Sequence, residues 1–199
     1  MAKLELGLPG VNVDPGDHIC ALYWGRTERD QLISAFVRAG LRGGAKCLCL
    51  IDTDDPAQVL DGISDNVSAL ITSRQLDVSR TMDAYLRDGR FTAESMIDYL
   101  EHTMAGVMAD GRFDHIRVVG EMSWVLRHPP GAGDLIRYES ALNRFSPRYP
   151  QVLMCMYDLV RFGGGVVLDL LRTHPRLLMG GMILDNPHYL SPDELEASR

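Results

Sequence analysis

Most of the residues in this sequence that could take part in chemistry come immediately after apolar runs of the kind that form buried strands. In an open α/β sheet, ligands bind beyond the carboxyl ends of the parallel strands, so residues after each run are the first candidates for a site. The main candidates, which include both tryptophans of the chain, are Tyr23, Trp24, Glu121, Trp124 and Arg161. Aromatic walls with one carboxylate and one guanidinium are typical of a pocket for a small, partly apolar organic molecule. We expect the three aromatic residues to form the walls, and Glu121 and Arg161 to orient a polar group of the ligand.

Glu121 is the most informative of these residues. It follows the apolar run His115–Gly120, so we expect a buried carboxylate, which needs a partner or a raised pKa. The sequence leaves three roles open: an ion pair with Arg161 or Arg117, a contact to a ligand, or a catalytic base. Trp124 likewise has two open roles, in the core or against a ligand.

Known phosphate-binding and catalytic motifs are missing from the sequence. The motif G-x-x-x-x-G-K-[ST] would lie between the first strand and the first helix, where Trp24-Gly25-Arg26-Thr27-Glu28 has one glycine and no lysine. Gly163–Gly165 opens a helix and could bind an anion through backbone N–H groups, but it also lacks the lysine. Neither a G-x-S-x-G elbow nor an H-E-x-x-H helix occurs. We therefore expect no enzymatic activity and no catalytic residues.

The cysteines show no metal-binding pattern. They form no CxxC pair and all lie in apolar runs, at Cys20, Cys47, Cys49 and Cys155. We expect them to be small buried hydrophobes in a reducing compartment, which favours a cytoplasmic location. Cys47 and Cys49 would face the same side of one strand, and thiol or metal chemistry there is left open.

The histidines and the acidic run after the second strand have structural interpretations as well. None of the six histidines is spaced as a ligand pair on one helix, so no metal site is predicted and any cofactor is unknown. His18 opens the first strand at the edge opposite the expected site, and His174 can bond the last carbonyls of a helix. Asp52, Asp54 and Asp55 are expected to be a solvated loop and helix cap, with a divalent-metal role as the alternative.

Length and composition are those of a globular protein. The 199 residues fit one domain over 1–199, with a core over about 14–194, and 46% are hydrophobic and 24% charged. A net charge of −7 without a basic cluster argues against direct nucleic-acid binding. No apolar run approaches the roughly 18 residues of a membrane helix, and the polar start is not a signal peptide.

Apolar periodicity predicts strands that alternate with helices. The expected strands are 18–24, 46–51, 74–78, 115–120, 151–157 and one near 177–184. The expected helices are 28–42, one beginning at Asp55, 92 to about 109, 134–146, 163–172, and a short terminal one begun by the capping box at Ser191. This alternation implies right-handed crossovers and an α/β fold in three layers, αβα, with a mostly parallel sheet. The strand order stays undetermined.

Several segments together resemble one known family. They are GDHICALY at 16–23, AGLRGG at 39–44, YLRDGRF at 85–91, RVVGEMSW at 117–124, YE at 138–139, CMYD at 155–158, LRTHP at 171–175 and NPHYLSP at 186–192. In order and spacing they resemble the MEDS domain, the methanogen/methylotroph sensory domain, over nearly the whole chain. The resemblance implies a fold similar to the RecA/KaiC-type ATPase core without its phosphate-binding loop, and a sensory role for small organic molecules. It also adds four candidate ligand-binding residues, His18, His174, Asn186 and Tyr189.

The leading hypothesis is therefore a non-enzymatic sensory domain that signals through a separate partner. The resemblance suggests a histidine kinase, an anti-sigma-type protein or a DNA-binding regulator as that partner. One alternative is a degenerate nucleotide-binding protein or weak ATPase. Another is an interaction module without a ligand that holds a kinase or regulator. The identity of the ligand, and whether the chain forms a homo-oligomer, stay open.

Overall fold

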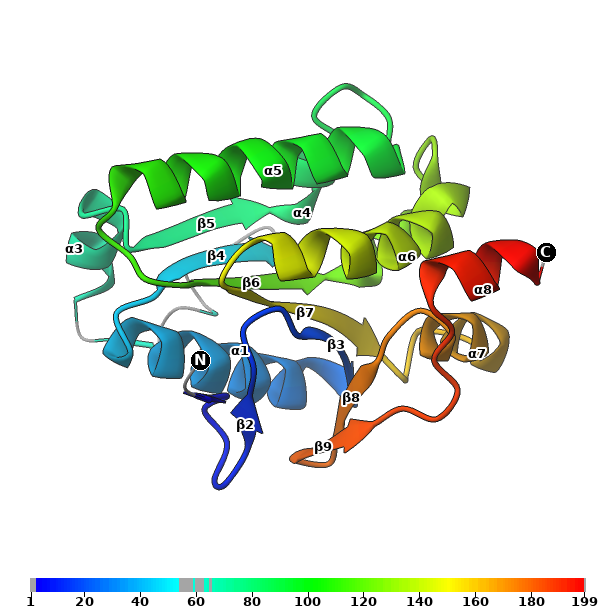
Figure 1. Cartoon of the computed structure of the whole chain (residues 1–199), viewed down its shortest axis with the longest axis horizontal. Coiled ribbons are helices and arrows are strands. Elements are labelled where there is room, and N and C mark those ends of the chain that lie inside the picture. The colour runs from blue at the N-terminus through cyan, green and yellow to red at the C-terminus, as the bar shows by residue number, and fades with distance from the viewer. Residues whose placement is uncertain (1–2, 54–58, 60–62, 65, 199) are drawn as a thin grey trace.

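A mostly parallel sheet of seven strands forms the centre of the protein (Figure 1). The computed structural model describes residues 3–53, 59, 63–64 and 66–198. In sheet order the strands are β5 (Leu76–Arg80), β4 (Lys46–Ile51), β6 (Ile116–Glu121), β7 (Gln151–Asp158), β3 (His18–Tyr23), β8 (Arg176–Met179) and β9 (Met182–Asp185). Neighbouring strands are parallel, except that β8 and β9 are antiparallel. The predicted fold class is confirmed.

Helices cover both faces of the sheet, which gives the predicted three layers (Figure 1). One face packs against α1 (Gly25–Arg42) and α3 (Val67–Thr72), and the other against α5 (Ala93–Asp110), α6 (Leu135–Phe145) and α7 (Gly164–Leu171). The remaining elements are β1 (Leu4–Glu5), β2 (Asn12–Val13), α4 (Thr81–Tyr85), α8 (Pro192–Ala197) and the 3₁₀ helices η1 (Met122–Arg127), η2 (Ala132–Asp134) and η3 (Ser146–Arg148). Strands β3, β4, β6 and β7 are buried at every position, as expected for strands covered on both faces.

Two of the helices begin at the capping residues that the sequence predicts. Thr92 accepts a hydrogen bond from the backbone N–H of Ser95 at 3.1 Å and begins α5. Ser191 and Glu194 form the predicted capping box of α8. The four cysteines are free and buried, also as predicted. The helix expected to begin at Asp55 lies outside the described residues.

Three boundaries differ from prediction, two of them for reasons of backbone conformation. Strand β5 begins two residues later than expected because Arg74 has φ +58°, in the left-handed region, and cannot continue a strand. The expected last strand is a hairpin, because Gly180 and Gly181 both have positive φ and turn the chain between β8 and β9. Helix α1 begins three residues early, with Trp24 alone between it and β3.

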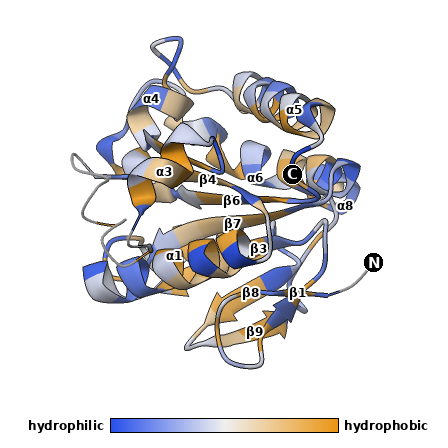
Figure 2. Cartoon of the chain, turned by 90° about the vertical axis from the view of Figure 1, so that its left-hand side faces the viewer, coloured by the Kyte–Doolittle hydropathy of each residue, from blue (hydrophilic) through white to orange (hydrophobic). Residues whose placement is uncertain are grey.

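The hairpin of β8 and β9 is apolar although it lies at the edge of the sheet (Figure 2). Met179, Met182 and Leu184 are exposed there.

None of the helices in the described part of the chain has the length and apolar character needed to cross a membrane.

Gly120 in β6 provides a test of the packing between the sheet and α4. A Cβ atom at this position would lie 2.6 Å from the hydroxyl oxygen of Tyr85. We therefore expect Gly120→Ala to lower the free energy of unfolding by about 1–3 kcal/mol. Tyr85→Phe removes the clashing oxygen, so the double variant should recover most of that loss. Urea denaturation of the wild type, both single variants and the double variant measures the coupling.

The matched control is Gly106→Ala on an exposed turn of α5, where a Cβ would meet nothing within 4 Å. Alanine in a helix is favoured over glycine by roughly 0.5–1 kcal/mol, so this variant should be neutral or stabilised. Strictly additive losses from Gly120→Ala and Tyr85→Phe would show that the two side chains do not compete for space.

Candidate functional site

Glu121 ends β6 at the carboxyl edge of the sheet and is buried, as predicted, with 2% of its surface exposed. The Tyr23 hydroxyl donates to its Oε1 at 3.2 Å, and the backbone N–H of Asp52 donates to its Oε2 at 2.9 Å. The guanidinium of Arg29, from α1, lies 3.4 Å from both carboxylate oxygens. Glu121 thus joins β3, β4, β6 and α1 at one point.

The ion-pair partner of Glu121 differs from the two arginines considered in the sequence. Arg161 is exposed in the loop after β7. Arg117 is buried under α1 near the start of β6, at the opposite end of the strand from Glu121, where it donates to the Phe36 carbonyl at 2.9 Å and lies over the Phe36 ring. The partner is Arg29 because helix α1 begins directly after β3 and so carries this residue, in its second turn, over the sheet edge.

Burial raises the pKa of Glu121 above its ordinary value. Arg29, the Asp52 amide and the Tyr23 hydroxyl act in the opposite direction, but they do not offset the loss of water. A carboxyl group of this kind is costly to keep charged, and its neighbours are correspondingly constrained in position.

The structure places Trp124 in the core, which is one of the two roles considered for it. Its side chain is fully buried and stacks on Tyr85, with ring centroids 4.7 Å apart. Phe91 packs edge-on at 5.0 Å. Among the described residues, the indole Nε1 has no hydrogen-bond partner. The two tryptophans therefore do not share one site, because Trp24 is 63% exposed at the start of α1.

The start of α1, where a phosphate-binding loop would lie, is occupied by carboxylates of the protein itself. The backbone N–H of Trp24 donates to Glu28 at 2.7 Å, and that of Gly25 donates to Asp158 at 3.1 Å. These N–H groups at a helix N-terminus are the ones that would otherwise bind an anion.

A hollow of about 350 Å³ lies beyond the carboxyl ends of β4 and β5, and it is connected to Glu121 through Asp52, whose backbone N–H binds that carboxylate. Its lining residues are Asp52, Thr53, Arg80, Thr81, Met82 and Arg127. Arg127 binds both carboxylate oxygens of Asp52, at 2.8 and 2.5 Å, and the Thr81 hydroxyl donates to the same carboxylate at 2.9 Å. The expectation that Asp52 belongs to a solvated loop is wrong, since only 7% of its side chain is exposed. Asp54 and Asp55 lie outside the described residues.

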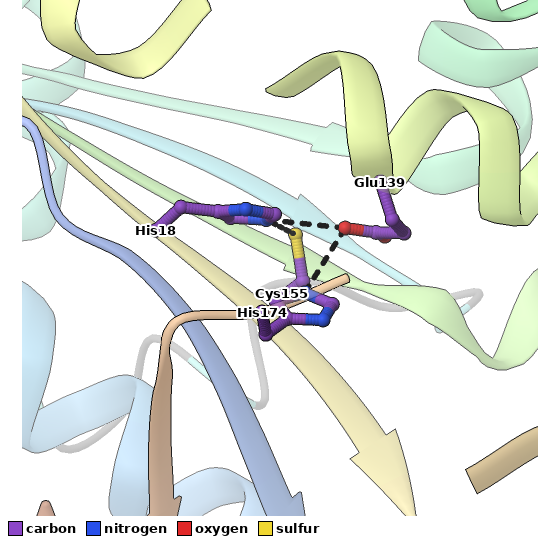
Figure 3. A group of neighbouring side chains, drawn as sticks. All are labelled: His18, Glu139, Cys155 and His174. Carbon is purple, nitrogen blue, oxygen red and sulfur yellow. Dashed lines mark hydrogen bonds and ion pairs between the residues drawn. The ribbon is translucent and has the colours of Figure 1, made fainter. Parts of the chain in front are cut away.

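A second group of polar residues lies inside the protein, between β3, β7 and α6 (Figure 3). The Nε2 atoms of His18 and His174 each lie 3.1 Å from the Oε2 atom of Glu139. The Tyr157 hydroxyl donates to Oε1 of Glu139 at 2.5 Å, and Cys155 Sγ lies 3.5 Å from His18 Nε2. We call His18, Glu139, Cys155 and His174 the inner cluster.

The electrostatics of the inner cluster are dominated by burial and by Glu139. Burial acts to raise the pKa of Glu139, but His174 and His18 outweigh it and hold that pKa far below its ordinary range. Burial, reinforced by His174, lowers the pKa of His18. Burial, reinforced by Glu139, raises the pKa of the Cys155 thiol well above its usual value.

Two of the remaining candidates lie behind His174. The Asn186 side chain donates to the carbonyls of Leu171 at 2.6 Å and His174 at 2.8 Å, and so holds the turn that carries this histidine. The predicted contact of His174 with the helix end is confirmed, with Nδ1 2.9 Å from the Leu170 carbonyl. Tyr189 is half-buried, and its backbone N–H donates to the Asn186 carbonyl at 3.2 Å.

The nine candidate residues thus do not form one site, and none of them lines the hollow. Tyr23 and Glu121 meet at the sheet edge, while His18 and His174 meet in the interior. Sequence reasoning missed Glu139, Cys155 and Tyr157 as partners of the histidines. A signal existed for Glu139, because it lies four residues after Leu135 and next to Tyr138 on the apolar stripe of α6, where a charged residue needs a partner.

The sheet order and the helical layers form an α/β fold that is RecA/KaiC-like. Flagellar accessory protein FlaH from Methanocaldococcus jannaschii matches with TM-score 0.59 and 12% identity, over 92% of this chain and 84% of that chain. The KaiC-like protein PH0186 from Pyrococcus horikoshii OT3 matches with TM-score 0.60 and 9% identity, over 88% of this chain and 79% of that chain. At these identities the likeness concerns the fold alone.

Residues 17–175 match the family described as MEDS, the MEthanogen/methylotroph, DcmR Sensory domain, and the chain belongs to this family. It is also 28% identical over 171 residues to the transcriptional repressor DcmR of Methylorubrum extorquens (strain DSM 6343 / CIP 106787 / DM4). That match covers 83% of this chain and 60% of the repressor. The predicted family resemblance is confirmed, and with it a sensory or regulatory role.

The raised pKa of Glu121 predicts how stability depends on pH. The protonated carboxyl is the form that folding favours, so its contribution is complete below the unfolded-chain pKa of about 4.3. It is lost as pH rises through the higher pKa of the folded state. We expect the free energy of unfolding of the wild type to fall relative to Glu121→Gln as pH rises from about 4 to 7. Urea denaturation of both proteins across this range measures the difference, and a difference independent of pH would contradict the prediction.

Proposed function

We propose that this chain is a non-enzymatic sensory domain that binds a small, partly apolar organic molecule and passes the signal to a separate regulatory protein. The observation that carries the proposal is the hollow lined by Asp52 and Arg127, at the sheet edge where α/β proteins bind their ligands. Its volume of about 350 Å³ lies at the lower end of the range of small-molecule pockets. Membership of a family of sensory domains supports the same role.

The lining of the hollow indicates which chemical groups the ligand carries. The Arg127 guanidinium and the Thr81 hydroxyl, both directed at Asp52, are suited to binding an oxygen of a carboxylate, carbonyl or alcohol. The Met82 side chain, 38% exposed, offers a soft apolar surface to a short carbon skeleton. We therefore propose a small oxygen-containing or polarisable organic ligand.

Asp52 provides a route from the hollow to the rest of the fold. Its side chain binds Arg127, while its backbone N–H binds Glu121, which in turn contacts Arg29 of α1. A ligand that competes with Asp52 for Arg127 changes the position of the loop after β4. Through Glu121, this change shifts the balance between two positions of α1 relative to the sheet.

Nucleotide binding is less well supported. The helix N-terminus that would receive phosphate already binds the carboxylates of Glu28 and Asp158, and negative charge there repels a triphosphate. The other alternative, an interaction module without a ligand, agrees with the position of Trp124 in the core, but it gives no role to the hollow. The similarity to a transcriptional repressor supports a regulatory output for the signal.

Thermal unfolding with a panel of short alcohols, carboxylates and halomethanes tests the proposal, with Mg²⁺–ATP as a separate arm. A ligand at 100 times its Kd stabilises the protein by about 2.7 kcal/mol. We expect at least one organic compound to raise the Tm, and Arg127→Met to abolish that rise because the ligand loses its guanidinium partner.

The matched control is Arg112→Met, which removes an arginine of similar exposure that pairs with Asp110 away from the hollow. It should leave the ligand-induced rise in Tm unchanged. A rise only with Mg²⁺–ATP would support the nucleotide-binding alternative. A rise that Arg127→Met does not affect would place the ligand elsewhere, and no rise with any compound would contradict the sensory proposal.

A further inference from the structure

The inner cluster brings four metal-binding side chains to one buried point (Figure 3). One donor atom from each of His18, Glu139, Cys155 and His174 lies within 4.8 Å of the other three. The residues come from β3, α6, β7 and the turn before β8, and all four are buried. Proximity alone does not define a site, but the hydrogen bonds around the cluster fix which atoms face its centre.

The His18 ring is held with its Nε2 lone pair toward the centre. The Asn143 amide group donates to the carbonyls of Thr173 at 2.6 Å and Glu139 at 3.3 Å, which fixes its orientation. Its amide oxygen therefore faces His18 Nδ1, at 3.0 Å, and accepts a hydrogen bond from it. The proton of a neutral His18 ring is thus on Nδ1, and Nε2 is left as an acceptor opposite Glu139.

The His174 ring has the same arrangement. Its Nδ1 lies 2.9 Å from the Leu170 carbonyl oxygen, which can only accept. The Thr173 hydroxyl, 3.0 Å from Nδ1, donates to the same carbonyl at 2.8 Å, so Nδ1 carries the proton. In the described part of the structure its Nε2 has no hydrogen-bond partner, although Glu139 Oε2 is only 3.1 Å away. A histidine that donates one ring N–H to a carbonyl and directs the other nitrogen inward is typical of metal ligation.

Glu139 completes a set of acceptors that face one another. Tyr157 donates to Oε1, so Oε2 is the oxygen directed at the two Nε2 atoms. A proton on the Nε2 atom of each histidine would leave two imidazolium rings, with centroids 4.3 Å apart, against a single carboxylate in a fully buried site. A net buried charge of this kind is costly.

One divalent cation resolves this conflict. Two neutral imidazoles, the Glu139 carboxylate and the Cys155 thiolate carry two negative charges in total, which a divalent ion neutralises. The thiol proton leaves to solvent as the sulfur–metal bond forms. In a tetrahedral site with bonds of 2.0–2.3 Å, donor atoms are roughly 3.3–3.8 Å apart. Of the six donor pairs, those at 3.1, 3.1 and 3.5 Å are within a few tenths of an ångström of this range. The other three lie within 4.8 Å, so ligation requires them to close by at most about 1–1.5 Å.

We propose that the inner cluster binds one divalent transition-metal ion of the zinc class, with His18 Nε2, His174 Nε2, Glu139 Oε2 and Cys155 Sγ as ligands. A thiolate with two imidazoles selects Zn²⁺ and similar ions over Mg²⁺ and Ca²⁺, which prefer oxygen ligands. Four protein ligands and full burial define a closed, structural site. Asn143 and Tyr157 are positioning residues that orient the ligands.

Refolding with Co²⁺ tests the site directly, because Co²⁺ bound to thiolate absorbs in the near ultraviolet and tetrahedral Co²⁺ absorbs strongly in the visible. The full chain is unfolded with a chelator and refolded under reducing conditions with Co²⁺ or Zn²⁺. We expect one equivalent of either ion per chain by elemental analysis, and both absorption features with Co²⁺. Cys155→Ser should lose the thiolate band, and Asn143→Leu should lower the affinity about 10–100-fold.

The matched control is Cys20→Ser, at the position paired with Cys155 in the neighbouring strand β3 and equally buried. This variant should keep the stoichiometry and both absorption features. Refolded wild type without bound metal, or a thiolate band that survives in Cys155→Ser, would overturn the proposal. Circular dichroism of each variant separates loss of metal from loss of fold, and the wild-type measurement stands even if a variant does not fold.

Discussion

The fully buried Glu139 carboxylate determines how four parts of this protein meet. It lies on α6, between histidines from β3 and from the turn before β8, and beside a tyrosine from β7. A charge without water must be matched by donors or cations at short distances, so these elements cannot shift independently. Apolar packing alone would tolerate small sliding movements of α6 over the sheet, but the pairing of Glu139 with two imidazoles does not.

The same constraint operates less strictly at the carboxyl edge. Glu121 is buried, but its neighbour Asp52 is at the wall of a hollow, and Arg127 beyond it is partly exposed. A network of charged groups therefore runs from the solvent to the interior of the fold, through the Arg127 guanidinium and then the carboxylates of Asp52 and Glu121. The inner cluster is fully enclosed, while the network around Asp52 is open to solvent on one side.

Much of the fold could be predicted because it follows from local patterns. Continuous apolar runs such as Lys46–Ile51 are strands buried on both faces, and Thr92 and Ser191 begin helices through their own side chains. The boundaries that failed depend on single dihedral angles, as at Arg74, which no periodicity reveals.

The sites could be predicted only in part. Glu121 was identified because a carboxylate after an apolar run is recognisable in sequence, but its partner Arg29 is 92 residues away. The inner cluster has no local spacing, since His18 is 121 residues from Glu139 and 137 from Cys155. Only the strand order, which sequence periodicity did not determine, brings these residues together.

The carboxylates at the start of α1 have a consequence for attempts to redesign this fold. Introducing a lysine and glycines after β3 would not by itself create an ATP site, because Asp158 and Glu28 would still compete for the same backbone N–H groups. Asp158 also accepts from the Val160 N–H, so its removal would loosen the loop after β7 as well. Converting the protein into a nucleotide binder thus requires coordinated changes in two strand–loop junctions that are distant in sequence.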